Sequence, residues 1–366
     1  MIRHSEFSLP GNPAEEHFFA GCAVRGAGFE QDASALLADY AAAAAAHGCS
    51  EESEILLRIH LSDAANQMPV LERLLKGRST FLSVVGQSPA NGGRIALEAW
   101  HWKGCEKRME GVGREILRFN GSEVFLFRTE GFVFPDSFQQ TRFEFESLKE
   151  ALVPHRMTVA DHTIRTWLYC RDVDNNYAGL VRARNEFFAQ NGLSAETHFI
   201  ASTGIEGQNA VPARLVAMDS ISWAGLRKEQ RIELKAEHML SPTALYGVSF
   251  ERGTRLCLRD RSHYYISGTA SIDRLGEVVH PHDVRRQTVR MIENIAALLE
   301  SSEGALADLR WATVYLRDAA DVEIVSSVLA EFLPENLPRV VAHAPVCRPA
   351  WLVEMECLAI NANALN

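Results

Sequence analysis

Three copies of one pattern occur along this chain of 366 residues, and they constrain the fold more than any other feature of the sequence. Each copy runs from a Gln to an Asp, and the copies span residues 31–63, 140–172 and 287–318. Each opens with apolar residues at helical spacing and ends in an alternating β-branched or aromatic run that is typical of a strand. The repeat therefore predicts one structural unit used three times.

The residues around each copy extend this unit. A second helical pattern and a closing strand follow each Asp, and a strand or hairpin candidate precedes each first helix. The closing strands are expected at residues 94–102, 213–223 and 351–360. The resulting ββαβαβ unit covers residues 17–102, 123–223 and 263–360 and predicts an α+β fold with helices on one face of each sheet.

The unit boundaries divide the chain into three expected domains. They are residues 1–110, residues 111–230, and residues 231–366, the last of which includes a connector. Residues 103–116 are polar and contain glycine, so we expect a linker there. Residues 225–260 are too many for a linker, and we expect them to pack on a sheet or line a cleft.

The charge balance excludes some classes of partner. Lys and Arg number 37 against 47 Asp and Glu, which gives a net charge of −10 without a basic block. This argues against nucleic acid or an anionic membrane as the main partner. The start of the chain lacks the apolar region of a signal peptide, and no apolar stretch is long enough to span a membrane, so we expect a cytoplasmic protein.

Cysteine and histidine patterns give no metal prediction. The seven cysteines are scattered and never spaced as CxxC, so neither disulfides nor a structural zinc site are expected. The segment "VVHPHDV" places His280 and His282 around Pro281, but no convergent partners are visible in the sequence. No metal site is therefore predicted.

The last closing strand carries the main candidate for chemistry. In "WLVEMECLAI", Glu354 and Glu356 alternate with apolar residues and so point to one face of the strand. That face is either a salt-bridged or exposed edge or a functional site. Glu98 and Asp219 fall at the matching place in the other two copies, which leaves open an architectural role for a carboxylate there.

Two residues before this strand suit a ligand pocket. Arg348 offers paired donors for a carboxylate, although it is equally compatible with a surface cation. Cys347 is either a packed apolar thiol or a pocket thiol. No Ser-His-Asp or Cys-His pair is found at a known spacing, so covalent catalysis has no support in the sequence.

The second copy supplies further candidates. Arg165, Trp167 and Tyr169 share one strand face, which indicates either a cleft wall or an arginine paired with a neighbouring acid. Weaker candidates on the following helix are Tyr177, Arg182 and Arg184. Tyr246, in the connector, is a further substrate-binding candidate. Two small, hydroxyl-rich segments would let backbone N–H groups approach an anion. The candidates from these segments are Thr203, Gly204, Ser267, Gly268 and Thr269.

The repeat resembles the YjgF/Rid (reactive intermediate deaminase) family. The resemblance is carried by "YISGTASIDRLGEVVHPHDVRRQTVRMIENIAALL", by the strand end "VYLRD" and by the terminal "LVEMECLAI". Proteins of this family are homotrimers with a central barrel and a ligand cleft at each subunit boundary. The resemblance implies a covalent pseudo-trimer around a β-barrel-like core, with Glu354 in the place of the family's water-positioning carboxylate.

A narrower resemblance is to the chorismatases, which build a Rid-like fold into one chain. It is carried by "IRTWLYCRDVDNNYAGLVRARNEFF", "ISGTASI" and "APVCRPAWLVEME". The seven-residue spacing of Cys347 and Glu354 is similar to that of the chorismatases that form 3-hydroxybenzoate. Leu168 stands where that family's Trp-Asn-Tyr pattern has Asn.

Three functions remain open from the sequence. The first is a cofactor-independent hydrolase or lyase that acts on chorismate or a related carboxylated enol ether and gives pyruvate and a hydroxybenzoate or dihydroxy acid. The second is a Rid-type imine or enamine hydrolase, and the third is a non-catalytic binding protein. The expected partner is a small carboxylated metabolite, and the expected assembly is a monomer or low-order oligomer.

Overall fold

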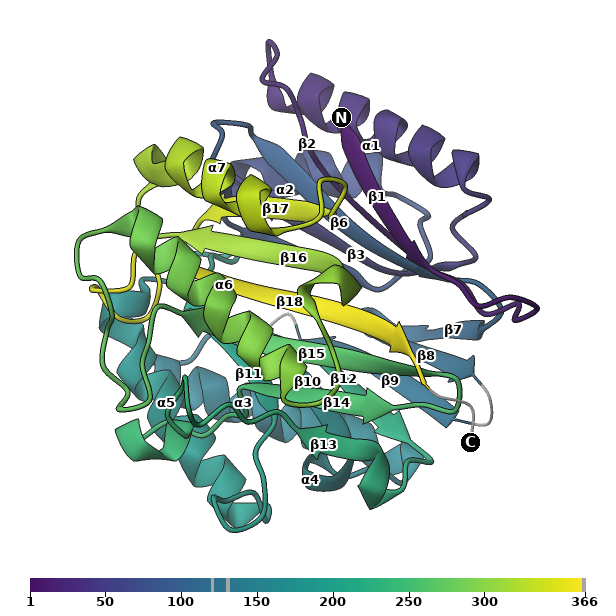
Figure 1. Ribbon diagram of the computed structural model, residues 1–366. Coiled ribbons are helices and arrows are strands. Elements are labelled where there is room, and N and C mark those ends of the chain that lie inside the picture. Colours follow the sequence, from purple (N-terminus) through teal and green to yellow (C-terminus); the bar gives the residue numbers. More distant parts are fainter. Residues whose placement is uncertain (120–121, 130–131, 364–366) are drawn as a thin grey trace.

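Helices and sheets alternate along the whole chain in the computed structural model, which describes residues 1–119, 122–129 and 132–363 (Figure 1). The α-helices of these residues are α1 (Phe29–Ala46), α2 (Ala64–Leu74), α3 (Ser137–Leu152), α4 (Val159–His162), α5 (Val173–Gln190), α6 (Val284–Glu300) and α7 (Val322–Phe332). Short 3-10 helices are η1 (Val153–His155), η2 (Lys228–Gln230), η3 (Thr243–Tyr246), η4 (Leu306–Asp308) and η5 (Ala319–Asp321). The described helices include none with both the length and the hydropathy needed to cross a bilayer.

The described strands form three sheets. The first has the order β1-β2-β6-β3-β4, with β1 (Ile2–Phe7), β2 (Glu16–Cys22), β3 (Glu54–Leu61), β4 (Leu82–Gly86) and β6 (Ile95–Trp102). The second has the order β11-β10-β12-β9-β8-β7, with β7 (Glu106–Gly111), β8 (Arg114–Phe119), β9 (Ser122–Thr129), β10 (Thr163–Cys170), β11 (Ala201–Glu206) and β12 (Val216–Ala224). The third has the order β13-β14-β15-β18-β16-β17-β5, with β5 (Ser88–Pro89), β13 (Arg231–Glu233), β14 (Gly253–Cys257), β15 (Arg261–Ala270), β16 (Leu309–Leu316), β17 (Arg339–His343) and β18 (Val353–Ala362).

One four-strand arrangement recurs in all three sheets. It is β2-β6-β3-β4 in the first, β9-β12-β10-β11 in the second and β15-β18-β16-β17 in the third. The closing strand lies in the middle, and the last pair is parallel in each sheet. The predicted ββαβαβ unit lacked one strand, which lies between the second helix and the closing strand. This strand is β4, β11 or β17, and it was missed because it is only five or six residues long and shows no clear period.

Local sequence signals explain where the helices lie. The Asp283 carboxylate caps α6 by accepting a hydrogen bond from the backbone N–H of Arg286, and Asp136 caps α3 in the same way. On α6, Met291, Ile295 and Leu298 recur at helical spacing and are fully buried. The poly-Ala run lies within α1, as the helix propensity of alanine predicts.

The two connecting segments differ in outcome. The prediction of a linker at residues 103–116 is wrong, because β7 and β8 form an antiparallel hairpin that extends the second sheet. Ile116 and Leu117 of β8 are buried, although the segment as a whole is polar. The polar composition therefore hid a strand that packs on the second sheet. Residues 225–260 pack on the third sheet through β13 and β14, as expected.

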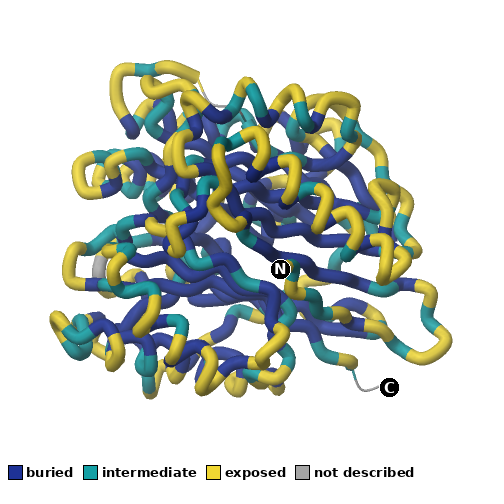
Figure 2. Tube along the Cα trace, turned by 90° about the horizontal axis from the view of Figure 1, so that it is seen from above, coloured by how far each residue is buried: buried dark blue, intermediate teal, exposed yellow. Residues whose placement is uncertain are grey.

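The two faces of the first and second sheets pack into different cores. On β10, Trp167 and Tyr169 join a large core shared by residues of all three sheets, while Leu168 and Cys170 pack under helices α3 and α5. The alternation follows from the two-residue period of a strand. Figure 2 shows the strands buried and the outer loops and helix surfaces exposed. The three sheets therefore turn one face toward a common core.

The sheets meet at narrow seams without closing into one barrel. Among the described strands, hydrogen bonding gives three separate sheets. Strand β5, which follows β4 of the first sheet in the chain, pairs with β17 in the third sheet, and single bridges such as Gly86 to Gln208 and Ile205 to Val346 connect the units. The expected barrel-like core is thus not closed. The seam between the second and third sheets contains the cavity described next.

Candidate active site

A cavity of about 510 Å³, here called the Glu354 cavity, lies between the second and third sheets. Helix α5, strands β11, β15 and β18, the β17–β18 loop and the segment before β14 contribute its walls. The lining residues are Tyr177, Arg184, Ser202, Thr203, Gly204, Val248, Phe250, Arg252, Gly268, Ala270, Ile272, Cys347, Arg348, Trp351 and Glu354.

Eight of the residues predicted from sequence line this one cavity. They come from α5, β11, β15, β18 and the β17–β18 loop, and they lie up to 177 residues apart in the chain, from Tyr177 to Glu354. They are Tyr177, Arg184, Thr203, Gly204, Gly268, Cys347, Arg348 and Glu354. The fold thus brings together candidates that the sequence analysis named on separate segments of the chain.

Glu354 is the acid of the cavity. Its strand β18 lies between β15 and β16, so the carboxyl group is buried instead of standing on an exposed edge. Gly268 makes room for it, because a Cβ at residue 268 would collide with Glu354 Oε1. The β15–β18 pairing shifts register between Ile266 and Thr269, which places Gly268 in a local irregularity.

The protonation of Glu354 follows from this burial. Removal from water, reinforced by the neighbouring carboxylate of Glu356, raises the pKa of Glu354 from 4.5 to about 8, while Arg252 and Arg165 act in the opposite direction. At neutral pH the group is therefore mainly a neutral acid. A carboxyl group with this pKa can donate a proton and then accept one back.

Strand register separates Glu354 from the other closing-strand acids. Glu98 lies opposite Arg58 on β3, Asp219 opposite Trp167 on β10, and Glu356 opposite Thr313 on β16. The expected match of Glu98 and Asp219 to Glu354 is therefore wrong by two residues, because both acids correspond to Glu356.

The positions equivalent to Glu354 can be identified from the same pairing. Ala96 lies opposite His60, Ala217 opposite Tyr169, and Glu354 opposite Tyr315. Among the three described sheets, only the third has a carboxylate at this position. The first and second sheets thus have no acid at the position equivalent to Glu354.

Three arginines line the Glu354 cavity. Arg184 is 1% exposed, and its Nε and Nη2 atoms have no hydrogen-bond partner among the described residues. Arg252 donates two hydrogen bonds to the Ser241 carbonyl, at 3.2 and 3.0 Å, and Arg348 lies 5.0 Å from the ring centroid of Trp351. A buried guanidinium with unpaired donors is costly unless an anion meets it. The cavity lining therefore offers positive charge and unpaired donors, an arrangement that can bind an anion.

Cys347 and Tyr177 form a neutral wall beside Glu354. Burial and the neighbouring Glu354 carboxyl group raise the pKa of Cys347 to about 12. Burial and the adjacent Cys347 raise the pKa of Tyr177 above its usual range. A thiol that stays protonated is a poor nucleophile, so the structure gives no support for covalent chemistry at Cys347.

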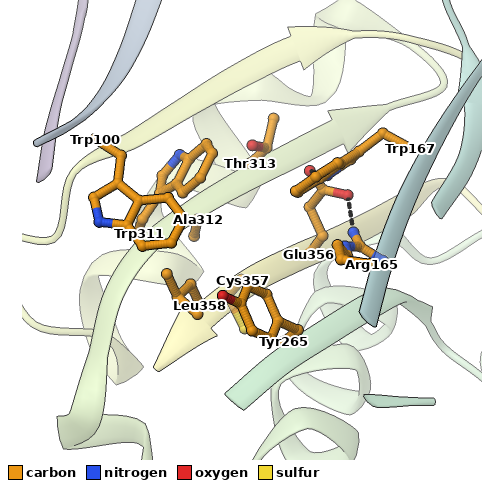
Figure 3. Close-up of a pocket in the computed structure, with 10 residues that line it drawn as sticks. All are labelled: Trp100, Arg165, Trp167, Tyr265, Trp311, Ala312, Thr313, Glu356, Cys357 and Leu358. Atoms are coloured by element: carbon orange, nitrogen blue, oxygen red, sulfur yellow. Dashed lines mark hydrogen bonds and ion pairs between the residues drawn. The ribbon is translucent and has the colours of Figure 1, made fainter. Parts of the chain in front are cut away.

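Arg165 and Trp167 line a second, inner cavity of about 320 Å³ in the common core (Figure 3). The Glu356 carboxylate accepts hydrogen bonds from Arg165 Nη2 at 2.6 Å and from Trp167 Nε1 at 2.8 Å. Arg165 Nη2 also donates to Thr203 Oγ1 at 2.5 Å, and Thr203 lines the Glu354 cavity. Arg165 thus lies between the two cavities. Its ion pair with Glu356 agrees with the second sequence interpretation, an arginine paired with a neighbouring acid.

The other predicted residues lie outside the cavity lining. Tyr169 is buried in the common core, with the Arg58 guanidinium 6.0 Å from its ring centroid. Ser267 and Thr269 are buried and hydrogen-bonded to the Glu251 carbonyl and to the Ser267 carbonyl, respectively. The side chain of Tyr246 lies outside the described part of the chain.

An outer groove leads away from the Glu354 cavity. It shares Tyr177, Val248, Cys347 and Arg348 with the cavity and adds residues of α5, including Arg182. The Arg182 guanidinium lies 4.3 Å from the ring centroid of Phe138. Arg182 thus lies at the groove and is absent from the inner lining.

Arg252 and Phe250 are among the cavity residues that sequence reasoning missed. Both lie in the segment before β14, which has no counterpart in the other two copies, so the repeat gave no position for them. Arg184 and Arg252 flank Phe250, at 5.8 and 5.5 Å from its ring centroid. The "SFERG" run, with an aromatic residue two positions before an arginine, was the available signal.

Comparison with known proteins was made by sequence and by structure. Residues 256–361 match the family model described as endoribonuclease L-PSP. A stretch of 96 residues is 33% identical to the 3-aminoacrylate deaminase RutC of Acinetobacter baylyi, covering 26% of this chain and 76% of that protein. The crystal structure of a chorismatase superposes with a TM-score of 0.64 at 22% identity, covering 84% of this chain and 93% of that chain.

Proposed function

Because the chain belongs to the endoribonuclease L-PSP (YjgF/Rid) family, we propose that it is a cofactor-independent hydrolase or lyase whose reaction takes place in the Glu354 cavity. The proposed substrate is chorismate or a related small enol ether with two carboxylates. The chorismatase similarity supports the fold that this proposal needs. The substrate itself is argued from the cavity.

One observation carries the proposal: a neutral carboxyl group and a buried, incompletely paired guanidinium line the same cavity. Glu354 supplies the acid, and Arg184 supplies the donors that lack a partner. Arg252 and Arg348 add two further cations to the lining. Several cations around one acid suit a dianion, since a single carboxylate needs one bidentate arginine.

The reaction starts with proton transfer from Glu354 to the methylene carbon of the enol ether. The carbon that carries the ether oxygen becomes electrophilic, and water adds to it while the Glu354 carboxylate takes up the proton that the water loses. The same carboxyl group then protonates the ring oxygen as the bond between that oxygen and the former enol-ether carbon breaks, and the Glu354 carboxylate takes back the proton that the hemiketal hydroxyl loses as the ketone of pyruvate forms. One water is consumed, and the products are pyruvate and a dihydroxy acid.

Cys347 is proposed to select between products. Its neutral thiol lies beside Glu354 and Tyr177, at the side of the cavity where the ring would lie. Loss of one water from the dihydroxy acid would make the ring aromatic and give a hydroxybenzoate. A neutral thiol at residue 347 favours this route because it is only a weak hydrogen-bond partner for a ring hydroxyl.

The second candidate function is hydrolysis of an imine or enamine that carries a carboxylate. The observation that favours it is the 33% identity to a 3-aminoacrylate deaminase. In this reaction Arg348 would hold the carboxylate, and Glu354 would orient the water that releases ammonia. A non-catalytic binding protein remains the third candidate.

We propose the same repeat architecture that the sequence indicated. The chain would be a covalent pseudo-trimer with units at residues 1–110, 111–230 and 231–366. The recurring four-strand order and the shared core support it. The proposed assembly is a monomer or low-order oligomer, and the proposed partner is a small carboxylated metabolite.

The functions can be separated by one set of assays. The purified protein is incubated with chorismate or with 2-aminoacrylate generated in situ, and pyruvate, aromatic product and ammonia are followed. The first proposal predicts pyruvate and aromatic or dihydroxy product from chorismate, lost in Glu354→Gln and retained in the exposed-site control Glu335→Gln. Faster ammonia release with no turnover of chorismate would replace it with the second function.

A further inference from the structure

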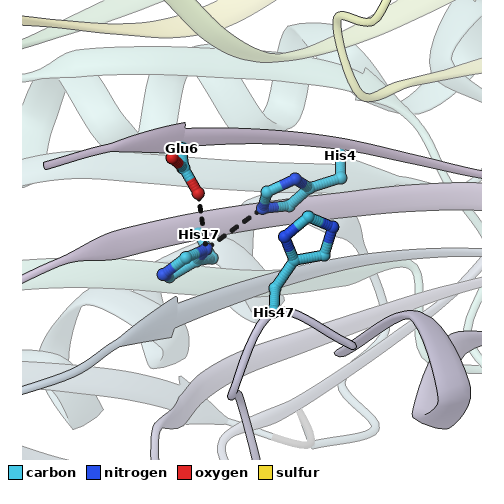
Figure 4. A group of neighbouring side chains, drawn as sticks. All are labelled: His4, Glu6, His17 and His47. Carbon is cyan, nitrogen blue, oxygen red and sulfur yellow. Dashed lines mark hydrogen bonds and ion pairs between the residues drawn. The ribbon is translucent and has the colours of Figure 1, made fainter. Parts of the chain in front are cut away.

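A cluster of three histidines and one glutamate lies on the first sheet, separate from the residues that line the Glu354 cavity (Figure 4). Its members are His4 and Glu6 on β1, His17 on β2 and His47 at the end of α1. One nitrogen or carboxylate oxygen of each residue lies within 4.8 Å of those of the other three. This His cluster is unrelated to the proposed reaction.

Strand register brings the cluster together. In the antiparallel β1–β2 pair, Glu6 lies opposite His17 and His4 lies opposite Phe19. His4 and Glu6 are two residues apart, so both side chains project from the same face of β1. His47 reaches that face from the C-terminal cap of α1. Three separate segments thus converge on one point.

The distances fit a metal ion. His4 Nε2 lies 3.1 Å from His17 Nδ1, and His17 Nδ1 lies 3.5 Å from Glu6 Oε2. Four ligands at about 2.0–2.2 Å from a tetrahedral Zn²⁺ place neighbouring donor atoms roughly 3.3–3.5 Å apart. Imidazole nitrogens with one carboxylate oxygen are ordinary ligands of zinc and related divalent transition metals.

The fourth member can join without disturbing the core. The His47 ring stacks on the His4 ring, with 3.6 Å between the ring centroids. His47 is exposed, so its ring can turn to direct a nitrogen at the point between His4 and His17. The cluster is thus open on one side and built on strands on the other.

The outer contacts of His17 strengthen the case. His17 Nε2 lies 3.3 Å from Glu15 Oε2, on the opposite side of the ring from the nitrogen that faces His4 and Glu6. A carboxylate that accepts the second N–H of a histidine leaves the first nitrogen free to bind a metal and fixes the ring. This arrangement accompanies metal-binding histidines in most zinc sites.

The cation Lys103 lies near the His cluster, where it is paired with Glu15. Lys103 Nζ is 3.0 Å from Glu15 Oε2 and 2.8 Å from the His47 carbonyl oxygen. Glu6 and Glu15 together carry two negative charges against the one positive charge of Lys103. A divalent ion would therefore enter surroundings with a net negative charge.

We propose that the His cluster binds one divalent transition-metal ion of the zinc type, which fastens β1 to β2 and to the end of α1. The sequence gave no sign of it because the four residues lie 2 to 43 positions apart and match no metal motif. The ion has a structural role in this proposal. It stabilises the edge strand of the first sheet.

The test is a titration of the metal-free full chain with Zn²⁺ against a chromophoric chelator, repeated with Co²⁺ for its absorption spectrum. We expect one equivalent bound, a higher Tm with Zn²⁺, and the intense visible bands of tetrahedral Co²⁺. His47→Asn and Glu6→Gln change exposed residues, so both variants should fold, and each should weaken binding by roughly tenfold or more.

The exposed-site control is His282→Asn, which should leave the titration unchanged. Binding of less than one equivalent to the native chain would overturn the proposal. So would affinity and Tm shifts that stay the same in both His47→Asn and Glu6→Gln. Circular dichroism of each variant in the absence of metal separates loss of the site from loss of the fold.

Discussion

The substitution Glu354→Gln should make the protein more stable at high pH. The carboxyl group is 5% exposed, and its pKa in the folded chain is about 8 against an ordinary 4.5, mainly because burial disfavours the charged form. The folded state thus binds this proton more tightly than the unfolded chain does. The stability that this group contributes is fully present below pH 4.5, falls as the pH rises from 4.5 to about 8, and levels off above that.

The size of the effect follows from the two pKa values. A difference of one unit corresponds to about 1.36 kcal/mol, so the shift to about 8 costs about 5 kcal/mol once the group is fully ionised. Glutamine has the shape of the protonated acid and cannot ionise. At pH 5 the variant and the native chain should therefore have similar free energies of unfolding, and at pH 9 the variant should be more stable by about 4–5 kcal/mol.

The assay is urea unfolding at pH 5, 7 and 9, with the variant and the native chain measured side by side. Glu115, whose pKa burial also raises to about 8, and Glu144, whose pKa burial raises above its usual range, titrate in both proteins. The difference between variant and native chain therefore isolates Glu354. Parallel pH profiles for the two proteins would refute the argument that Glu354 is a buried neutral acid.

Three further substitutions probe the same region. Arg184→Met should leave the free protein as stable as before or more so, because it removes a buried and incompletely paired cation, yet weaken ligand binding by about 2 kcal/mol or more, as measured by calorimetry. Gly268→Ala should displace the Glu354 carboxyl group and lower kcat by about 100-fold, with a thermal melt as the check that the fold survives. Glu356→Gln should destabilise the chain by about 3–5 kcal/mol in urea unfolding, because Arg165 loses its carboxylate partner, and should lower the pKa of Glu354 seen in the pH–rate profile.

The repeat carried most of the fold prediction. Helix and strand periods within 31–63, 140–172 and 287–318 agree with the helix and strand that follow each Gln. The short parallel strands β4, β11 and β17 were not predicted, because a run of five or six residues is too short to show a clear alternation of apolar and polar residues. The hairpin β7–β8 escaped because its glycines and charges also suit a linker, and only the partner strand β9 decides between them.

The site was predicted where neighbouring residues share a strand or loop. Cys347, Arg348 and Glu354 lie within eight residues of one another, and the structure places all three in one cavity. Side-chain pairs between residues of different sheets could not be predicted from the sequence in the same way. The ion pair of Arg165 and Glu356 joins residues 191 positions apart, and no period or motif connects them. A role for each residue in catalysis remains a prediction.

The common core has a consequence for how the three sheets associate. The inner faces of β6, β10 and β18 each bury large side chains only because the other two sheets cover them. In a trimer of separate chains, dilution would uncover these faces. Here the peptide chain keeps them at a high effective concentration, so association costs no loss of free translation and does not depend on protein concentration. No third of the chain should fold on its own when expressed separately, and the three sheets should melt in one cooperative transition.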